Sequence, residues 1–367
     1  MERPLRVLFL TRYPELGASS RYRVYQYLPY LEKHGIESEV QSFMDDDLYR
    51  LAFSHGQTLK KLVATARATI RRTAKIAAAQ AYDVIVMQRE LLPFGPPILE
   101  RSIKHRKTPL VFDYDDALFI AKPSRFNPIA TALRSPRKIR TIFRISDLVL
   151  AGNDWLRDQA RRYGANAITL EVAENTSRFL PRSRRSGDAP VTIGWLGSPS
   201  TVKYLNLVAP VLRQLAADFP QLRFIQMGGG DFTMHGVPWE SREWSLGSEV
   251  EALHEFDIGL MPLPDEEWAL GKSGGKARTY MAAGVVPVCS ALGYNLQLIQ
   301  HGKTGFLCTT LNQWKQTLNE LIANAELRHN IGQQAQQEVK HRFAPETIAG
   351  ELARALRSVA KLPQESN

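Results

Sequence analysis

The sequence predicts an α/β protein made of two Rossmann-like, doubly wound parallel-sheet domains that face a cleft. Three observations lead to this prediction. The 367 residues are too many for one ordinary hydrophobic core. Segments typical of buried strands alternate with helix-length segments along the chain. The alternation starts twice, at residues 5 and 191, on either side of a segment rich in Pro, Arg, Ser and Gly. We interpret that segment, residues 178–190, as the linker.

The first domain, expected over residues 1–177, opens with the apolar run Leu5–Thr11, which is typical of a buried parallel strand. A turn of small residues and a helix over about 21–33 follow it. Helix-length sequence separates the further strands that we expect, at 37–43, 83–87, 109–112, 147–151 and 167–172.

The second domain, expected over residues 190–344, repeats this opening with a strand at 191–196, a small-residue turn and a helix to residue 218. Further strands are expected at 222–227, 256–261 and 285–289. In both domains a buried strand, a tight turn and a helix come in sequence. This arrangement binds phosphates at the carboxyl ends of parallel strands.

Composition narrows the class of protein. Apolar residues make up 44% of the chain and charged residues 23%, which excludes wholesale disorder. Two cysteines, Cys289 and Cys308, offer no disulfide framework and no cysteine-based zinc site, which fits a reducing compartment. No apolar run is long enough for a signal peptide or a membrane span. We therefore expect a cytoplasmic protein that can reach the inner face of the membrane.

The net charge of +10 lies mainly in the first half of the chain. Residues 1–175 carry a balance of +9, and residues 176–367 a balance of +1. Two stretches without any acid, 48–82 and 117–146, contain seven Lys or Arg residues each. This distribution predicts an anionic partner for the first domain, such as lipid headgroups or a phosphorylated acceptor. We do not expect nucleic acid, because no nucleic-acid motif and no interleaved aromatic residues accompany the charge.

A phosphate-binding helix start is predicted near residue 275. The run Ser273-Gly274-Gly275-Lys276 opens a helix, with Lys272 before it and Arg278 in its first turns. Cations there oppose the helix macrodipole by about 0.3–1 kcal/mol each, so stability alone does not favour them. An anion on the free backbone N–H groups removes the conflict. The alternative is a solvated helix start with incidental lysines.

Four segments, taken in order, resemble the retaining GT-B glycosyltransferases of glycosyltransferase family 4. They read SRYRVYQYLPYLEKHGIE from Ser20, LVLAGNDWLRDQARRYG from Leu148, TIGWLGSPSTVKYL from Thr192, and DIGLMPL followed by KARTYMAAGVVPV from Asp257. The resemblance implies a GT-B fold and hexosyltransferase-like transfer of a sugar from a nucleotide-diphosphate sugar to an acceptor hydroxyl. It further implies retention of anomeric configuration, a role in cell-surface glycan (polysaccharide) or glycolipid biosynthesis, and a last helix, 345–360, that packs back on the first domain. No cofactor and no metal are expected.

The resemblance also assigns the donor-binding residues. Lys276 matches the lysine near the donor diphosphate, and Gly197 the glycine whose backbone faces the nucleotide. Ser198 stands where many members have an arginine, and Thr279 where the second glutamate of an E-x7-E pattern contacts the ribose. Gly271 falls at the first glutamate, so both glutamates are absent from register. The expected donor site comprises Gly197, Ser198, Lys203, Lys272, Gly274, Gly275, Lys276 and Thr279.

Acidic residues follow the strand at 109–112, in the order Asp113-Tyr114-Asp115-Asp116. Acids at the carboxyl end of such a strand face the ligand side of a doubly wound sheet. We expect Asp115 or Asp116 to orient the acceptor hydroxyl as the catalytic group. The D-x-D spacing also resembles a metal site, but we disfavour that interpretation because the phosphate-binding features lie in the other domain. The alternative is that Asp113 or Asp116 caps a helix.

Polar residues of the opening turn are further candidates on the same side of the sheet. Ser19, Ser20, Arg21 and Arg23 could contact the acceptor or the donor phosphates, since Arg suits bidentate phosphate contacts. The alternative is that both arginines are surface residues of the first helix. Gln88-Arg89-Glu90 follows another strand end, and Trp239 and Trp244 precede the strand at 256–261, where relatives of the resembled family hold the nucleotide base.

A basic, Ala-rich helix is predicted over residues 59–81. Its apolar residues are spaced for one face, at 59, 62, 63, 66, 70 and 74. Such a helix can lie on an anionic membrane or can pack this face on its own domain. Two other functions stay open: a nucleotide-sugar epimerase on the same fold, and a catalytically silent protein that binds sugar nucleotides or glycans.

Overall fold

The computed structural model describes residues 3–52, 54, 56–120, 136–179 and 189–360. The chain forms two compact units, one of residues 1–173 with 345–367 and one of residues 174–344. Each unit is an α/β domain with a parallel six-stranded sheet, which confirms the predicted fold class. The predicted linker lies mostly in 180–188, outside the described residues, as do residues 121–135 of the second acid-free stretch.

The N-terminal domain has the strand order β2-β1-β3-β4-β5-β6, with all neighbours parallel. Its strands are β1 (Leu5–Thr11), β2 (Ile36–Ser42), β3 (Val84–Gln88), β4 (Leu110–Tyr114), β5 (Leu148–Ala151) and β6 (Ala167–Thr169). The order reverses between β1 and β3, which makes the carboxyl ends of these two strands the expected ligand edge.

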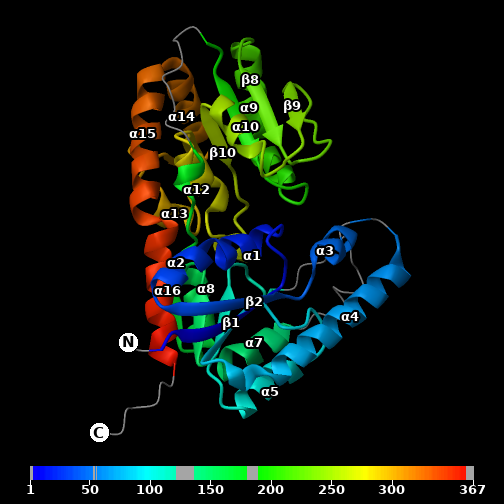
Figure 1. Cartoon of the computed structure of the whole chain (residues 1–367). Coiled ribbons are helices and arrows are strands. Elements are labelled where there is room, and N and C mark those ends of the chain that lie inside the picture. The colour runs from blue at the N-terminus through cyan, green and yellow to red at the C-terminus, as the bar shows by residue number, and fades with distance from the viewer. Residues whose placement is uncertain (1–2, 53, 55, 121–135, 180–188, 361–367) are drawn as a thin grey trace. The chain divides into compact units, whose positions relative to one another are not determined.

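Helices cover both faces of this sheet (Figure 1). The longer ones are α4 (Thr58–Ala77), α5 (Ile98–His105), α7 (Pro136–Ile145), α8 (Asp154–Arg162) and α16 (Pro345–Val359). Shorter helices are α1 (Ala18–Arg23), α2 (Leu28–Lys33) and α3 (Asp46–Ala52), with single 3-10 turns at Tyr25–Tyr27, Ala79–Ala81 and, in the C-terminal unit, Thr176–Arg178. The C-terminal α16 belongs to this core, where Ile348, Leu352 and Leu356 are buried beside Val24 and Leu31.

The C-terminal domain has the strand order β12-β11-β10-β7-β8-β9, again parallel. Its strands are β7 (Thr192–Leu196), β8 (Arg223–Met227), β9 (Trp239–Arg242), β10 (Ile258–Met261), β11 (Val286–Ser290) and β12 (Phe306–Cys308). The order reverses between β7 and β10, so this domain has a ligand edge of the same kind.

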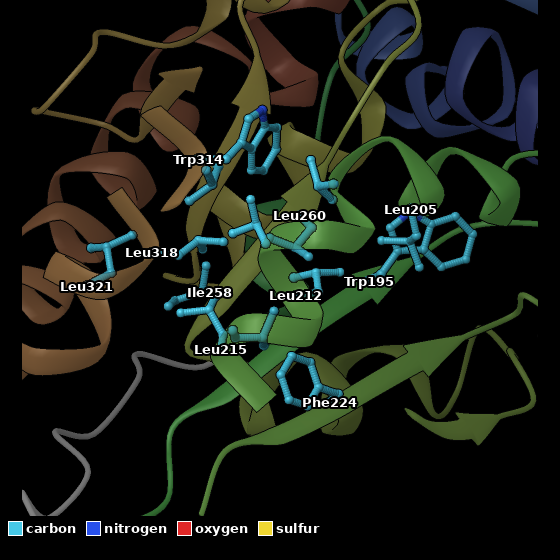
Figure 2. Close-up of a cluster of buried hydrophobic side chains, with 14 of the residues drawn as sticks. Trp195, Leu205, Leu212, Leu215, Phe224, Ile258, Leu260, Trp314, Leu318 and Leu321 are labelled. Atoms are coloured by element: carbon cyan, nitrogen blue, oxygen red, sulfur yellow. The ribbon is translucent and has the colours of Figure 1, made fainter. Parts of the chain in front are cut away.

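The helices of this domain are α9 (Ala209–Asp218), α10 (Glu249–Glu255), α11 (Glu267–Leu270), α12 (Gly275–Ala282), α13 (Asn295–Leu298), α14 (Leu311–Ala323) and α15 (Ala325–Arg342), with a 3-10 segment at Val202–Val208. Apolar side chains from the sheet and from α9 and α14 pack into one cluster, in which Trp195, Leu260, Trp314 and Leu318 are buried (Figure 2). This packing holds the end of β7, whereas Ala277 and Tyr280 of α12 are buried in a second cluster on the C-terminal domain.

Candidate functional site

A chain of hydrogen bonds crosses the carboxyl ends of β1, β3 and β4 in the N-terminal domain. Ser19 Oγ donates to both carboxylate oxygens of Asp115 at 3.0 Å. Gln88 Nε2 donates to Ser19 Oγ at 2.9 Å, and Ser20 Oγ donates to Gln88 Oε1 at 2.8 Å. The structure therefore brings three sequence-predicted residues, Ser19, Ser20 and Asp115, into one network, with the weaker candidate Gln88 at its centre.

Arg89 holds the two carboxylates that follow β4. Its Nη2 lies 2.7 Å from Asp116 Oδ2 and 3.9 Å from Asp115 Oδ1. The backbone of Arg89 has a φ of +62°, a left-handed conformation that non-glycine residues seldom adopt and that is enriched at functional sites. Burial raises the pKa of Asp115 above its ordinary range. The positive charge of Arg89 lowers this pKa and the negative charge of Asp116 raises it further, but burial has the largest effect. A half-buried carboxylate with a raised pKa is suited to exchange a proton with a hydroxyl.

Asp113 and Arg23 form an ion pair inside the domain rather than a surface for a ligand. Both are 1% exposed, and the guanidinium donates from Nε and Nη2 to the carboxylate. Nη1 of Arg23 donates to the Leu170 carbonyl at 2.6 Å. Burial raises the pKa of Asp113 although Arg23 acts against it. The predicted contact of Arg23 with acceptor or phosphate therefore competes with an internal partner, and the D-x-D pattern has one carboxylate already engaged.

Arg21 lies apart from this network. Its Nη1 donates to the main-chain carbonyls of Glu15 and Leu16 at 3.2 and 3.3 Å, and its guanidinium lies 5.3 Å from the ring of Tyr22. Arg21 thus ties down the loop before α1, and its side chain stays partly exposed.

Lys276 and Gly197 lie in contact at the ligand edge of the C-terminal domain. A Cβ at Gly197 would lie 2.7 Å from Cε of Lys276 and 2.4 Å from the ring of Trp195, so only glycine leaves room for the lysine. Nζ of Lys276 lies 5.4 Å from the centre of the Trp195 ring. Two residues of the expected donor site, Lys276 and Gly197, therefore lie side by side in the structure.

The Lys276 ammonium has no hydrogen bond or ion pair with the described residues. Burial, with a further contribution from Lys272, lowers the pKa of Lys276 to about 8. The lysine lies in the first turn of α12, whose N-cap Gly274 has a φ of 67° and supplies no side-chain cap. A Cβ at Gly275 would meet no atom within 4 Å, so space is open at this helix start. A half-buried cation and uncapped N–H groups together favour an anion.

Two further lysines of the predicted donor site stand on neighbouring aromatic rings. Nζ of Lys272 lies 3.8 Å from the centre of the Trp268 ring, and Nζ of exposed Lys203 lies 5.5 Å from that of Tyr204. The two rings are 6.3 Å apart. The rings that these two lysines contact are thus neighbours, although 69 positions separate the lysines in the sequence. Ser198 is exposed and shares a hydrogen bond of 2.9 Å with the Ser200 hydroxyl.

Thr279 has a buried partner that sequence reasoning missed. Its hydroxyl donates to Glu174 Oε2 at 3.0 Å, and the other oxygen of Glu174 is buried without a hydrogen bond. Burial raises the pKa of Glu174 to about 7, although Arg278 acts against it. A carboxylate therefore does reach position 279, from a residue 105 positions away. No periodicity or motif around Glu174 could have indicated this pair.

The two tryptophans have different surroundings. Trp239 packs edge-on against Phe224, with ring centres 5.6 Å apart, in the core. Trp244 is 38% exposed, and its Nε1 donates to Glu249 at 2.6 Å. Glu249 in turn accepts from Arg178 at 3.1 Å. Trp244 is consequently a fixed but accessible ring.

None of the helices among the described residues is long and apolar enough to cross a membrane. Within the same residues, no three His, Cys, Asp or Glu side chains gather in a way that could hold a metal ion.

Known proteins share this architecture. Residues 278–338 match the family model described as glycosyl transferases group 1. The Anabaena protein HepE, solved with UDP and glucose, has a TM-score of 0.64 at 17% identity over 96% of this chain and 100% of that one. Sucrose-phosphate synthase from Thermosynechococcus elongatus gives 0.66 at 14% identity over 96% and 98%. A glycosyltransferase from Rickettsia africae gives 0.69 at 13% identity over 98% and 100%. No curated protein has a significantly similar sequence.

Proposed function

We propose that the protein transfers a sugar from a nucleotide-diphosphate sugar to an acceptor hydroxyl, with retention and without a metal, because residues 278–338 match the group 1 glycosyltransferase model and the chain has a GT-B fold. The observation that carries this proposal is Lys276. It is a half-buried lysine with a pKa lowered to about 8 and no anionic partner among the described residues, at an open glycine-rich helix start. A donor diphosphate supplies the missing anion.

In this proposal the C-terminal domain binds the donor. The N–H groups at Gly274 and Gly275 and the ammonium of Lys276 contact the diphosphate, whose negative charge grows as the bond to the sugar breaks. Lys272 and Lys203 add positive charge near Ser198. Preformed positive charge in a partly buried site stabilises this leaving group without reorganisation.

The N-terminal domain binds the acceptor in this proposal. Asp115 orients the acceptor hydroxyl, Asp116 and Arg89 hold Asp115 in place, and Ser19 fixes its carboxylate through the hydrogen bonds described above. The raised pKa of Asp115 suits transient acceptance of the hydroxyl proton. The basic charge of this domain suits a lipid-linked or otherwise anionic acceptor, as in the assembly of cell-surface glycans or glycolipids.

A second candidate is a catalytically silent protein that binds sugar nucleotides. It is favoured by Thr279, whose hydroxyl is engaged by Glu174 where the resembled family has a glutamate for the ribose. Such a protein binds the donor as tightly as an enzyme does but never releases the nucleotide from the sugar.

A panel of UDP-, GDP- and ADP-sugars in a thermal-shift assay tests the binding step. A ligand that binds only the folded protein stabilises it by about 2.7 kcal/mol at 100 times its Kd. Nucleotide release is then measured with the sugar that gives the largest shift, with and without a lipid-linked acceptor. No shift with any of them would refute both candidates. A shift with no chemical change of the donor favours the silent protein. Isomerisation of the donor sugar without an acceptor and without nucleotide release favours an epimerase.

A further inference from the structure

The apolar face of α4 points away from the domain that carries the helix. Leu59, Leu62 and Ile70 are 75%, 62% and 69% exposed, and Val63 is exposed as well. These are the residues whose spacing predicted one apolar face. The domain instead buries the other side of α4, through Ala68, Arg72 and Ile76. Packing on its own domain therefore does not account for the apolar face.

A row of basic side chains runs along one flank of this face. At 3.6 residues per turn, Lys60, Arg67 and Arg71 lie on one line beside Leu59, Val63 and Ile70. Lys60 and Arg67 have no ion pair with the described residues. Arg71, although 45% exposed, contacts Asp45 at 3.2 Å. The helix contains no acidic residue.

The other basic residues of α4 serve the domain itself. Arg72 is fully buried and donates to the carbonyls of Thr11 and Gln41 at 2.6 and 3.1 Å. Lys61 donates to the Ser54 carbonyl at 2.6 Å, and Lys75 to the Tyr82 hydroxyl at 2.7 Å. One side of α4 is thus anchored by hydrogen bonds, while its apolar face and the Lys60–Arg67 row are presented to the outside.

We propose that α4 is a membrane-docking helix that lies in the surface of an anionic bilayer, with Leu59, Leu62, Val63 and Ile70 among the lipid chains and Lys60 and Arg67 at the headgroups. An apolar stripe inserts into the boundary between headgroups and acyl chains, and a flanking basic row is attracted to anionic lipid. The basic row complements the negative charge of the headgroups, which favours an anionic bilayer over a neutral protein surface as the partner of this face. Delivery of the enzyme to a lipid-linked acceptor rests on the proposed function, whereas the docking itself does not.

Co-sedimentation of the full chain with vesicles tests the docking. We expect binding to vesicles that contain phosphatidylglycerol at low salt, little binding to phosphatidylcholine alone, and weaker binding as salt screens the charge. Lys60→Glu with Arg67→Glu should weaken binding at least about 30-fold, since each basic residue contributes about fivefold. A matched double change in the other domain, Lys303→Glu with Lys340→Glu, should have a much smaller effect.

A second pair of variants separates insertion from charge alone. Leu59→Gln with Ile70→Gln should weaken vesicle binding at least about tenfold at constant charge, because both apolar side chains lose their burial in lipid. Leu296→Gln with Leu311→Gln removes two comparably exposed apolar residues from the other domain and should leave binding unchanged. All four changed positions are exposed, so melting temperatures should stay near that of the wild type.

Insertion can also be observed directly. A fluorophore on Leu62→Cys should shift to the blue with anionic vesicles, while one on Gln337→Cys should not; the two natural cysteines are buried and should not be labelled. The proposal would be overturned if the wild type did not bind anionic vesicles. It would also be overturned if the charge variant or the apolar variant bound them as well as the wild type does. Self-association that Leu59→Gln with Ile70→Gln abolishes would overturn it too, because the face would then bind a second copy. The nucleotide-sugar shift is measured without vesicles, so its failure is distinguishable from a failure of docking.

Discussion

Replacing Lys276 by methionine should make the ligand-free protein more stable and donor binding weaker. Methionine keeps the side chain out to the Cε position and so its apolar packing near Trp195, but it removes the charged ammonium. The lysine has its pKa lowered from 10.5 to about 8 because burial and Lys272 disfavour the ammonium. The charge is therefore a cost to the folded protein that only a bound anion offsets.

The size of both effects follows from the same charge. Each pKa unit corresponds to about 1.4 kcal/mol, so the lowered pKa costs up to about 3 kcal/mol at neutral pH. We expect Lys276→Met to recover about 1–3 kcal/mol, which raises Tm by about 2–4 °C per kcal/mol in a domain of 150–250 residues. Loss of a charged hydrogen bond should weaken donor binding by about 1.5–3 kcal/mol, or about 10- to 150-fold in Kd.

The pH dependence supplies a check on the cause. Because the Lys276 pKa is lower in the folded than in the unfolded chain, the cost is present below pH 8 and disappears as pH rises from about 8 to 10.5. The stability difference between wild type and Lys276→Met should therefore shrink over that range. Wild-type donor affinity should fall as pH rises above about 8, because the bound anion favours the ammonium and raises the Lys276 pKa in the complex.

Urea denaturation and calorimetric titration of the preferred nucleotide sugar measure these quantities. The matched control is Lys340→Met, which removes an exposed lysine from α15 of the same domain and should change neither. A destabilised Lys276→Met protein with unchanged donor affinity would refute the reasoning, because the lysine would then have a structural partner and no part in binding.

Four further predictions concern the buried acids and the metal. Asp113→Ala should lower the free energy of unfolding, measured in urea, by about 3–5 kcal/mol, because it leaves Arg23 charged and unpaired inside the domain. The control Asp158→Ala, at an exposed position, should lower it by less than about 1 kcal/mol. Equal losses of stability would contradict the internal pair. Glu174→Gln should stabilise the protein at pH 8 by up to about 3 kcal/mol and have little effect at pH 5. The pKa of Glu174, about 7, means that wild-type stability falls as pH rises from about 4.5 to 7. A stability gain that does not depend on pH would exclude titration of this group. Transfer activity should persist after exhaustive EDTA treatment, whereas loss that manganese or magnesium restores would reinstate a metal at Asp113 and Asp115. Asp115→Asn should lower kcat by about 10²–10⁴ with an unchanged donor thermal shift, and a loss of the shift instead would place this residue in donor binding.

The strands of both sheets could be predicted because buried parallel strands form continuous apolar runs between small-residue turns. Two strands were missed, β9 and β12, which lie at opposite edges of the C-terminal sheet. β9 has the sequence WESR and is half-exposed, so no apolar run indicates it. β12 has three residues, and its position is fixed by parallel pairing with β11. These two edge strands form because they pair with β8 and β11, and the local sequence does not show that pairing.

The candidate site was predictable where it depends on local chemistry and not where it depends on pairing across the fold. The Gly-Gly-Lys run identified the start of α12 by itself. The order of the three acids at the end of β4 does not show which of them is internal. Asp113 still belongs to the strand and meets Arg23, 90 positions away, whereas Asp115 follows the strand end and meets Ser19. Such choices are made by side chains from distant segments.

The helix α4 shows why a function cannot be inferred from apolar periodicity without a structure. Spacing identifies a face, but a face that packs on its own domain and a face that binds a partner have the same spacing. In this chain the domain packs on Ala68, Arg72 and Ile76 and leaves two leucines and an isoleucine largely in water. At about 25 cal/mol for each Å² of apolar surface, an isolated globular domain would be more stable with these side chains turned inward. The inverted arrangement is therefore understandable only if a partner covers the face, and its basic flank favours an anionic partner.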